Sequence, residues 1–291
     1  MMRSLFSAVS GMRNHQTLMD VVGNNIANVN TVAFKSARVN FQDLISQTVR
    51  GASAPSNNLG GSNPVQVGLG VQLGSIDLLM AQGNLQATGR TTDMAIQGDG
   101  WFVLSDGAST PTISFTRDGN FDLAVPSTPG GDRALVHTTS GLQVLGYTSG
   151  VPVTADSNTP PQPITIPQTQ NGVAVTGFNI APNGVISLVL ADGTSVSNFA
   201  QIALAKFPND GGLERAGSNL FKPTVNSGQA VYNGAAANGR GEVKAGFLEM
   251  SNVDLATQFT NMIIAQRGFQ SNSRVITATD EILQDLVNIK R

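Results

Sequence analysis

Residues 24–35 read NNIANVNTVAFK and contain four asparagines within the first seven positions. Asparagine tolerates the left-handed conformation that ends helices, and its side chain hydrogen-bonds to neighbouring backbone groups. The cluster follows a segment with helical periodicity, and the periodicity does not continue beyond it. It therefore predicts that an N-terminal helix stops here and that the chain turns.

From Leu5 onward, apolar or small residues recur at alternating steps of three and four. This heptad spacing predicts an amphipathic helix with one seam, at Leu5, Ala8, Met12, His15, Met19, Val22, Ile26 and Val29. The other end of the chain repeats an apolar residue every seven positions, at Leu255, Met262, Phe269, Ile276 and Leu283. Ser251 stands three positions before Asp254 and is the predicted N-cap of this second helix.

The segment between the two helices has the composition of a β-rich region. The chain contains 32 glycines and 13 prolines, a profile that favours short strands joined by many turns. Four turn dipeptides between β-branched or aromatic runs predict β-hairpins, at Asp99-Gly100, Asp118-Gly119, Asn183-Gly184 and Asp192-Gly193. Turn-forming residues are so dense over 50–68 and over the Pro/Thr-rich 154–172 that both stretches predict irregular structure.

These patterns predict an α+β fold that is mainly β, with paired N- and C-terminal helices forming a coiled-coil-like module. The expected organisation is an N-terminal helix and turn over 1–45, an irregular linker over 46–75, a β-rich domain over 76–250 with a short excursion near 154–172, and a C-terminal helix over 251–291. A helix of about 40 residues is roughly 60 Å long, which exceeds the length of the N-terminal seam. Part of the C-terminal apolar stripe is therefore expected to face other molecules.

Composition excludes several classes of function. The net charge is −2 and the 17 basic residues are scattered, so no electrostatic footprint for nucleic acid exists. The chain has no cysteine, which excludes disulfides and thiolate metal sites. No run approaches the roughly 18 apolar residues that span a bilayer, and serines interrupt the first apolar stretch. We therefore expect neither membrane insertion nor a cleavable secretory signal.

Catalytic motifs are missing from the sequence. Its two histidines, His15 and His137, fall in different predicted modules, which excludes a zinc site of His and Cys ligands. Neither a G-x-S-x-G elbow nor a G-x-x-x-x-G-K-[ST] loop occurs. Four carboxylates lie in turn-rich stretches, where their ordinary role is to form turns: Asp93, Asp99, Asp118 and Asp122. We predict no catalytic, cofactor-binding or metal-binding residues.

Three stretches carry a resemblance to a known family. Residues 20–36, DVVGNNIANVNTVAFKS, closely resemble the N-terminal signature of bacterial flagellar rod and hook proteins, an Asn-Asn-[Ile/Leu]-Ala-Asn core followed by Thr and Phe-Lys. Residues 91–123 resemble the β domain of this family, and residues 250–290 resemble its C-terminal helix. The signature residues of this chain are Asn24, Asn25, Asn28, Thr31, Phe34 and Lys35. Ala33 departs from the family, which usually has Gly there, and this bears on the local turn only.

Within the family the resemblance favours the hook protein, and in particular the small hook proteins of Firmicutes. The stretch AQRGFQSNSRVI (265–276) is similar to the hook protein, whereas the distal rod protein more often has Tyr-Glu in place of Phe269-Gln270. The chain is shorter than many hook proteins, which favours the distal rod weakly. The distal rod protein is therefore the alternative, and a β-rich hydrolase or carbohydrate-binding module with helical ends is the alternative from another class.

The resemblance implies a non-enzymatic subunit that polymerises into the curved, tubular flagellar hook between rod and filament. The two helices would line the tube, with assembly-seam residues Leu5, Met12, Met19, Ile26, Leu255, Met262, Phe269, Ile276 and Leu283. Implied partners are further copies in a helical homopolymer, the rod and hook–filament junction proteins, the hook cap and the export apparatus. The implied location is the basal body and hook, extracellular after flagellar type III export.

Overall fold

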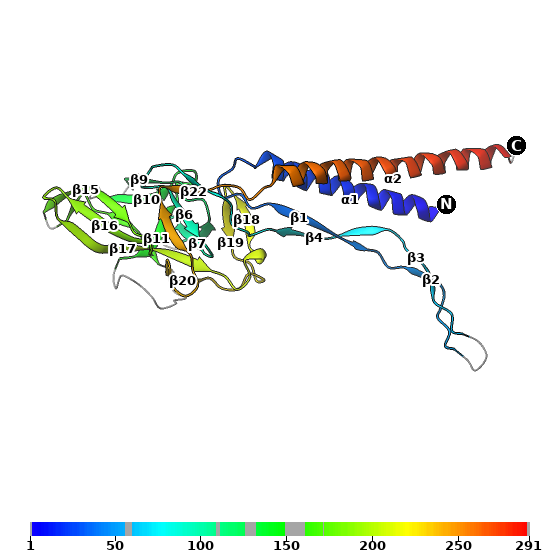
Figure 1. Ribbon diagram of the computed structural model, residues 1–291, viewed down its shortest axis with the longest axis horizontal. Coiled ribbons are helices and arrows are strands. Elements are labelled where there is room, and N and C mark those ends of the chain that lie inside the picture. The colour runs from blue at the N-terminus through cyan, green and yellow to red at the C-terminus, as the bar shows by residue number, and fades with distance from the viewer. Residues whose placement is uncertain are drawn as a thin grey trace. The chain divides into compact units, whose positions relative to one another are not determined.

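The structure, a computed structural model, describes residues 2–55, 60–108, 111–125, 132–148, 161–170 and 172–289. The chain divides into two compact units, which Figure 1 shows as ribbons. The helical unit contains Met1–Val29, Ser36–Leu79 and Val253–Arg291, and the β unit contains Asn30–Lys35 and Met80–Asn252. The α+β, mainly β architecture with one helix near each end agrees with the prediction.

Two antiparallel helices form the first part of the helical unit (Figure 1), α1 at Met2–Ala27 and α2 at Leu255–Ile289. The predicted stop signal is confirmed, because α1 ends at Ala27 within the asparagine cluster. There the Asn28 backbone N–H and its side-chain Nδ2 both donate to the Asn24 carbonyl, at 3.2 and 2.9 Å.

The N-cap of α2 is Asp254, so the prediction of Ser251 was wrong. The carboxylate of Asp254 accepts a hydrogen bond from the Ala256 N–H at 3.1 Å and another from the Thr257 hydroxyl. These bonds lower the pKa of Asp254, the Thr257 hydroxyl more than the backbone. Residues 251–254 are not helical, which leaves Asp254 as the residue placed to cap the first turn.

A long two-stranded ribbon completes the helical unit. Strand β1 (Ala37–Asp43) pairs antiparallel with β4 (Val71–Leu78), and β2 (Gln47–Arg50) pairs with β3 (Val65–Val67). The sequence predicted an irregular linker over 46–75, but β2, β3 and the first part of β4 lie within this range. Turn-forming residues concentrate between β2 and β3, and even there Ser53 pairs with Ser62. The flanking valines and leucines alternate with polar residues, which suits extended chain.

Over its described residues, the β unit contains one large antiparallel sheet and two short pairs. Fourteen strands belong to the sheet: β7 (Trp101–Ser105), β8 (Ile113–Thr116), β9 (Phe121–Ala124), β10 (Arg133–His137), β11 (Gln143–Tyr147), β12 (Gln162–Pro163), β13 (Thr165–Ile166), β14 (Thr169–Gln170), β15 (Val173–Ile180), β16 (Val185–Leu190), β17 (Ser195–Lys206), β18 (Glu214–Gly217), β19 (Leu220–Lys222) and β20 (Val231–Gly234). The pairs are β5 (Leu85–Ala87) with β22 (Phe247–Glu249), and β6 (Met94–Gln97) with β21 (Glu242–Ala245); a 3-10 turn, η1, spans Asp210–Gly212.

Two of the four predicted hairpins form. Asn183-Gly184 joins the paired strands β15 and β16, and Asp192-Gly193 joins the paired strands β16 and β17. The other two predictions were wrong: Asp99-Gly100 and Asp118-Gly119 each connect strands that pair elsewhere. Gly119 shows why, because a Cβ there would lie 1.5 Å from the Met94 carbonyl oxygen. This glycine permits a close backbone approach across the unit rather than a tight hairpin.

The core of the β unit uses residues from the stretch predicted as an excursion. Residues 154–160 and 171 lie outside the described residues, but Ile164 and Ile166 belong to the buried hydrophobic cluster. Strand β12 pairs with β11 and β13 pairs with β10, so this part of the excursion is incorporated into the sheet. Large side chains from several strands complete the cluster, among them Phe102, Phe121, Leu135, Leu188 and Leu204.

Candidate assembly surfaces and the signature turn

The last residues of the signature fold onto the β unit through an unusual backbone conformation. Ala33 has a φ of 56°, in the left-handed region, and its N–H donates to the Glu249 carbonyl at 2.7 Å. Phe34 is buried, with the Arg215 guanidinium 4.7 Å from its ring centroid. This turn directs the next side chain, Lys35, into the interior of the β unit.

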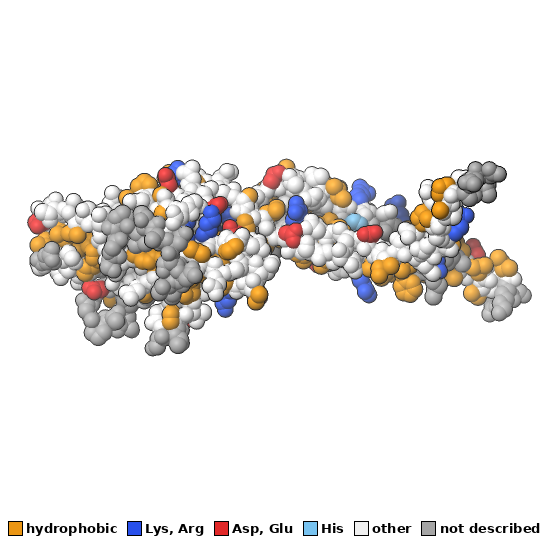
Figure 2. All heavy atoms as spheres, turned by 90° about the horizontal axis from the view of Figure 1, so that it is seen from below, with side chains coloured by type: hydrophobic (Ala, Val, Ile, Leu, Met, Phe, Trp, Pro, Cys, Tyr) orange, Lys and Arg blue, Asp and Glu red, His pale blue; other side chains and the backbone are white. Residues whose placement is uncertain are grey.

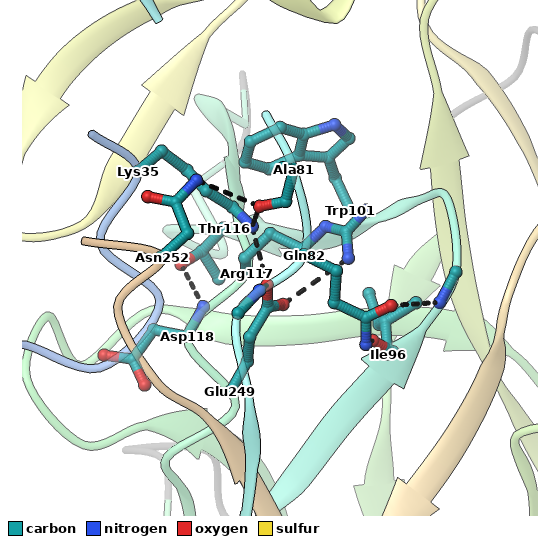
Figure 3. A network of polar contacts seen from close by, with 12 residues as sticks. Lys35, Ala81, Gln82, Ile96, Trp101, Thr116, Arg117, Asp118, Glu249 and Asn252 are labelled. Carbon is teal, nitrogen blue, oxygen red and sulfur yellow. Dashed lines mark hydrogen bonds and ion pairs between the residues drawn. The ribbon is translucent and has the colours of Figure 1, made fainter. Parts of the chain in front are cut away.

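A buried ion cluster surrounds Lys35 (Figure 3). Its Nζ lies 2.6 Å from Oε1 of Glu249 and donates to the Ala81 carbonyl at 3.0 Å. The same carboxylate oxygen accepts the Gly83 N–H at 2.9 Å, and its other oxygen lies 3.5 Å from Arg117. Lys35 and Glu249 are 1% and 0% exposed, so the charges are withdrawn from water.

Charge in this cluster is unevenly balanced, because two cations meet one carboxylate. Burial lowers the pKa of Lys35, and the neighbouring Glu249 carboxylate opposes that shift. Burial also lowers the pKa of Arg117, again opposed mainly by Glu249. Because desolvated charges are tolerated only with good partners, Glu249 is the group on which both cations depend.

The cluster joins the two segments through which the chain leaves the β unit. The chain leaves the β unit once after Lys35 and again after Asn252, which lies three residues beyond Glu249. The Asn252 N–H donates to the Phe34 carbonyl at 3.3 Å, and its side chain donates to the Ala81 carbonyl at 3.1 Å. Both exits from the unit are therefore fixed to one small region of it.

The first part of the signature lies in the helical unit. Asn25 is buried and exchanges two hydrogen bonds with the backbone of Ala37, at 2.8 and 3.0 Å. Its side chain also donates to Gln258 Oε1 at 3.2 Å, so it links α1, β1 and α2. Asn24 and Asn28 bond to each other at the end of α1, and the Thr31 carbonyl accepts from Phe34 in the β unit.

Sequence reasoning did not find Glu249, Arg117 or Asn252 as partners of the signature. Glu249 lies 214 positions from Lys35, and nothing in the linear sequence joins them. The available signal was an acidic residue at the end of a short apolar strand just before the C-terminal helix. A carboxylate in that position requires a buried partner.

The helix pair uses part of the predicted seam of α1, because Ala8 and Val22 are buried and His15 lies against Gly268 of α2. Asn25 meets Gln258, and a Cβ on Gly268 or Gly11 would lie within 2.6 Å of His15 or Asn272, respectively. The predicted seam residues Leu5, Met12, Met19, Ile26, Met262, Phe269 and Ile276 are only partly buried, and Leu255 and Leu283 are 39% and 37% exposed. In this contact Gly268 lies opposite His15 and Gly11 lies opposite Asn272, because glycine lets two helices approach closely.

Helix α2 therefore presents a large apolar surface to its surroundings. Figure 2 shows hydrophobic side chains over the surface of the helical unit, at the right of the view. The exposed large apolar residues of α2 are Leu255, Phe259, Ile263, Ile264, Val275, Ile282, Leu283, Leu286, Val287 and Ile289. Exposed apolar surface of this extent is characteristic of a protein–protein contact.

The remaining candidates from the sequence have structural surroundings. His15 packs at the helix crossing, with its ring centroid 6.4 Å from that of Phe41, and His137 is buried between Asp118 and Ser140. Within the described ranges, no group of three or more His, Asp or Glu side chains is arranged to hold a metal ion. Neither described helix is long and apolar enough to cross a membrane.

Three family descriptions match successive parts of the chain. Residues 5–35 match "Flagella basal body rod protein", and residues 95–188 match "Flagellar hook protein FlgE/F/G D1 domain". Residues 244–289 match "Flagellar basal body rod FlgEFG protein C-terminal". The matches include the signature, much of the β unit and most of α2.

Full-length relatives include both rod and hook proteins. The flagellar basal-body rod protein FlgG of Bacillus subtilis is 46% identical over 295 positions, and that of Borreliella burgdorferi is 36% identical over 297; both alignments cover all of each chain. The flagellar hook protein FlgE of Borreliella burgdorferi is 31% identical over 451 positions, again covering all of each chain. This chain has 291 residues, so the rod relatives align almost without length difference.

Proposed function

Because the chain belongs to the FlgE/F/G family of flagellar rod and hook proteins, we propose that it is a subunit of the distal rod of the flagellar basal body. It is a structural protein of the flagellar axis and not an enzyme, as are the families and relatives that it matches. One observation carries the choice of rod: the 46% identity to a rod protein over 295 positions, against 31% over 451 for a hook protein.

This choice replaces the hook, which the sequence had favoured. The hook prediction depended on Phe269-Gln270 and their neighbours, a local feature of α2. Chain length and sequence identity are properties of the whole chain, and both favour the distal rod protein over the hook protein. We assign the chain to the rod on that basis.

The proposed polymer forms through the helical unit. Proteins of this family assemble into polymers within the flagellar basal body, and the exposed apolar face of α2 supplies a surface for such assembly. The helices line the tube through the predicted seam residues. The signature turn fixes the segment of chain that follows α1. The partners are further copies, adjoining rod and hook proteins and the type III export apparatus, which delivers the subunit beyond the cell membrane.

The shape of the polymer distinguishes the two functions. Purified chain is concentrated until it polymerises, and the polymers are imaged by electron microscopy. A rod subunit is expected to give straight, stiff tubes. Curved tubes would assign the chain to the hook instead.

Assembly through α2 can be tested by placing a charge on the predicted seam. Leu283→Asp and Ile276→Asp place an unpaired carboxylate on the predicted seam, so both variants are expected to remain monomeric. Lys290→Ala, which replaces a charged residue that follows α2 in the sequence and leaves the seam unchanged, is the control and should polymerise like the wild type. Normal polymers from both Asp variants would remove the seam from the proposal.

A further inference from the structure

A groove in the helical unit is lined by α1 and by residues of and beside the ribbon. It has a volume of about 530 Å³, and its apolar lining includes Phe6, Val9, Leu44, Leu69 and Leu73. Phe6 is 68% exposed, so its ring is available to another molecule. Among the lining residues, Arg13 is the one with a charged side chain.

The α2 helix of the same chain does not reach this groove. Ala8, Gly11 and His15 lie on the contact side of α1, where Gly11 and His15 face α2. The groove residues Phe6, Val9 and Arg13 each precede one of these by two positions. Two residues turn a helix by about 200°, so the groove lies on the opposite side of α1. An occupant must come from elsewhere.

The last turns of α2 have the complementary chemistry. Ile282 and Leu286 are 50% and 48% exposed, and Leu283, Val287 and Ile289 are exposed beside them. Asp280, Glu281 and Asp285 lie among these residues, and no basic residue occurs between Arg274 and Lys290. An apolar, acidic helix end matches an apolar groove with an arginine.

The other exposed apolar segment of α2 is a poorer match. Residues 255–266 present Leu255, Phe259 and Ile263 to solvent, but they contain no acidic residue. The charged residues next to this segment are Arg267, which would repel Arg13, and Asp254, whose carboxylate already accepts hydrogen bonds from Ala256 and Thr257. Charge therefore selects the end of α2 over its beginning.

We propose that the groove between α1 and the ribbon receives residues 280–289 of α2 from a second copy of the chain. This contact rests on the proposed function, since it is one that a rod polymer would use. The groove and the helix end are different surfaces of one subunit, so the contact is head-to-tail. A row of subunits then has an unoccupied groove at one end and an unbound helix end at the other. Such contacts build open helical polymers.

Cysteine cross-linking tests the contact directly, because the chain has no native cysteine. Phe6→Cys and Leu286→Cys chains are mixed, polymerised and oxidised. A covalent dimer is expected from the mixture and not from either variant alone. The control mixture pairs Phe6→Cys with Ile263→Cys, which should give no dimer. Normal polymers without the first dimer, or a dimer in the control, would overturn the proposal.

Charge reversal tests it without a cysteine. Arg13→Glu is expected to raise the concentration needed for polymerisation by about tenfold, because like charges then meet in the contact. Adding Asp280→Arg and Asp285→Arg to the same chain should restore most of this loss. Unchanged polymerisation of Arg13→Glu, or failure of the combined variant to recover, would overturn the contact. Straight wild-type tubes with these outcomes would retain the rod function and reject this contact alone.

Discussion

At the residue scale, Glu249 is the central group of the buried cluster. It accepts from Lys35 and from the Gly83 N–H, and it lies 3.5 Å from Arg117. Removing Lys35 leaves Arg117 beside the Glu249 carboxylate, whereas removing the charge of Glu249 takes from Lys35 its carboxylate partner and leaves Arg117 with the weaker influence of Asp210 and Asp99. The two halves of the ion pair therefore contribute unequally to stability.

This asymmetry predicts the order of two substitutions. Glu249→Gln is expected to lower the free energy of unfolding of the β unit by about 4 kcal/mol and Lys35→Met by about 2 kcal/mol. Urea denaturation followed by fluorescence of Trp101, the single tryptophan, measures both. Exposed Lys222→Met is the control and should change the value by less than about 0.5 kcal/mol. A larger loss for Lys35→Met would mean that Arg117 does not stabilise Glu249.

Ala33 offers a second test at this scale, because its φ of 56° is unfavourable for a residue with a Cβ. Ala33→Gly and Ala95→Gly each remove one buried methyl group from the β unit, but only the first also relieves a left-handed residue. We expect Ala33→Gly to be the less destabilising by about 1 kcal/mol in the same urea experiment. Equal losses at the two positions would show that the left-handed backbone of Ala33 carries no strain.

At the element scale, glycine determines how closely α1 and α2 approach. A Cβ on Gly268 would lie 2.5 Å from the His15 ring, whereas one on Gly23 would meet nothing within 4 Å. The same Gly→Ala change should therefore act in opposite directions at the two positions.

Gly268→Ala is expected to separate the helices and to reduce helicity in far-UV circular dichroism. Gly23→Ala should stabilise α1 by about 1 kcal/mol, the difference in helix propensity. Adding His15→Ala to Gly268→Ala makes room for the methyl group and should restore the helicity. If Gly268→Ala behaves like Gly23→Ala from the outset, the close crossing at His15 is not present in solution.

Elements with local causes could be predicted from the sequence, and those with distant causes could not. The end of α1 followed from Asn24 and Asn28, whose side chains act within a few residues. The turn at Asp118-Gly119 was misassigned because its glycine permits a close approach to the distant Met94 backbone, and the turn at Asp99-Gly100 because the strands on either side of it pair with distant strands. Lys35 belonged to a recognised signature, but its partner Glu249 is placed by the fold of the β unit. The heptad pattern included Ala8, His15 and Val22 but not Gly11 and Gly268, because such patterns emphasise apolar side chains.

At the scale of the whole molecule, the two units bury apolar surface to different extents. The β unit has a continuous core that includes Phe102, Phe121 and Leu204, all fully buried. Of the large apolar residues of α2, ten are exposed, so this surface is available to other molecules. A protein of this kind is expected to complete one unit by itself and the other only in the polymer.

Assembly should therefore change the protease resistance of α2 but not that of the β unit. In dilute monomer we expect trypsin to cut at Arg267 and Arg274 much faster than within the β unit, because a helix with little buried surface opens easily. In the polymer, cleavage at these two sites should slow by about tenfold or more, since the neighbouring subunits cover the helix. Mass spectrometry of the peptides measures both rates.

Leu283→Asp, which is expected not to polymerise, is the matched control and should stay sensitive at the concentration where the wild type becomes resistant. If α2 of the dilute wild type already resists trypsin as well as the β unit does, the helix pair is complete within one chain, and its exposed apolar face does not drive assembly.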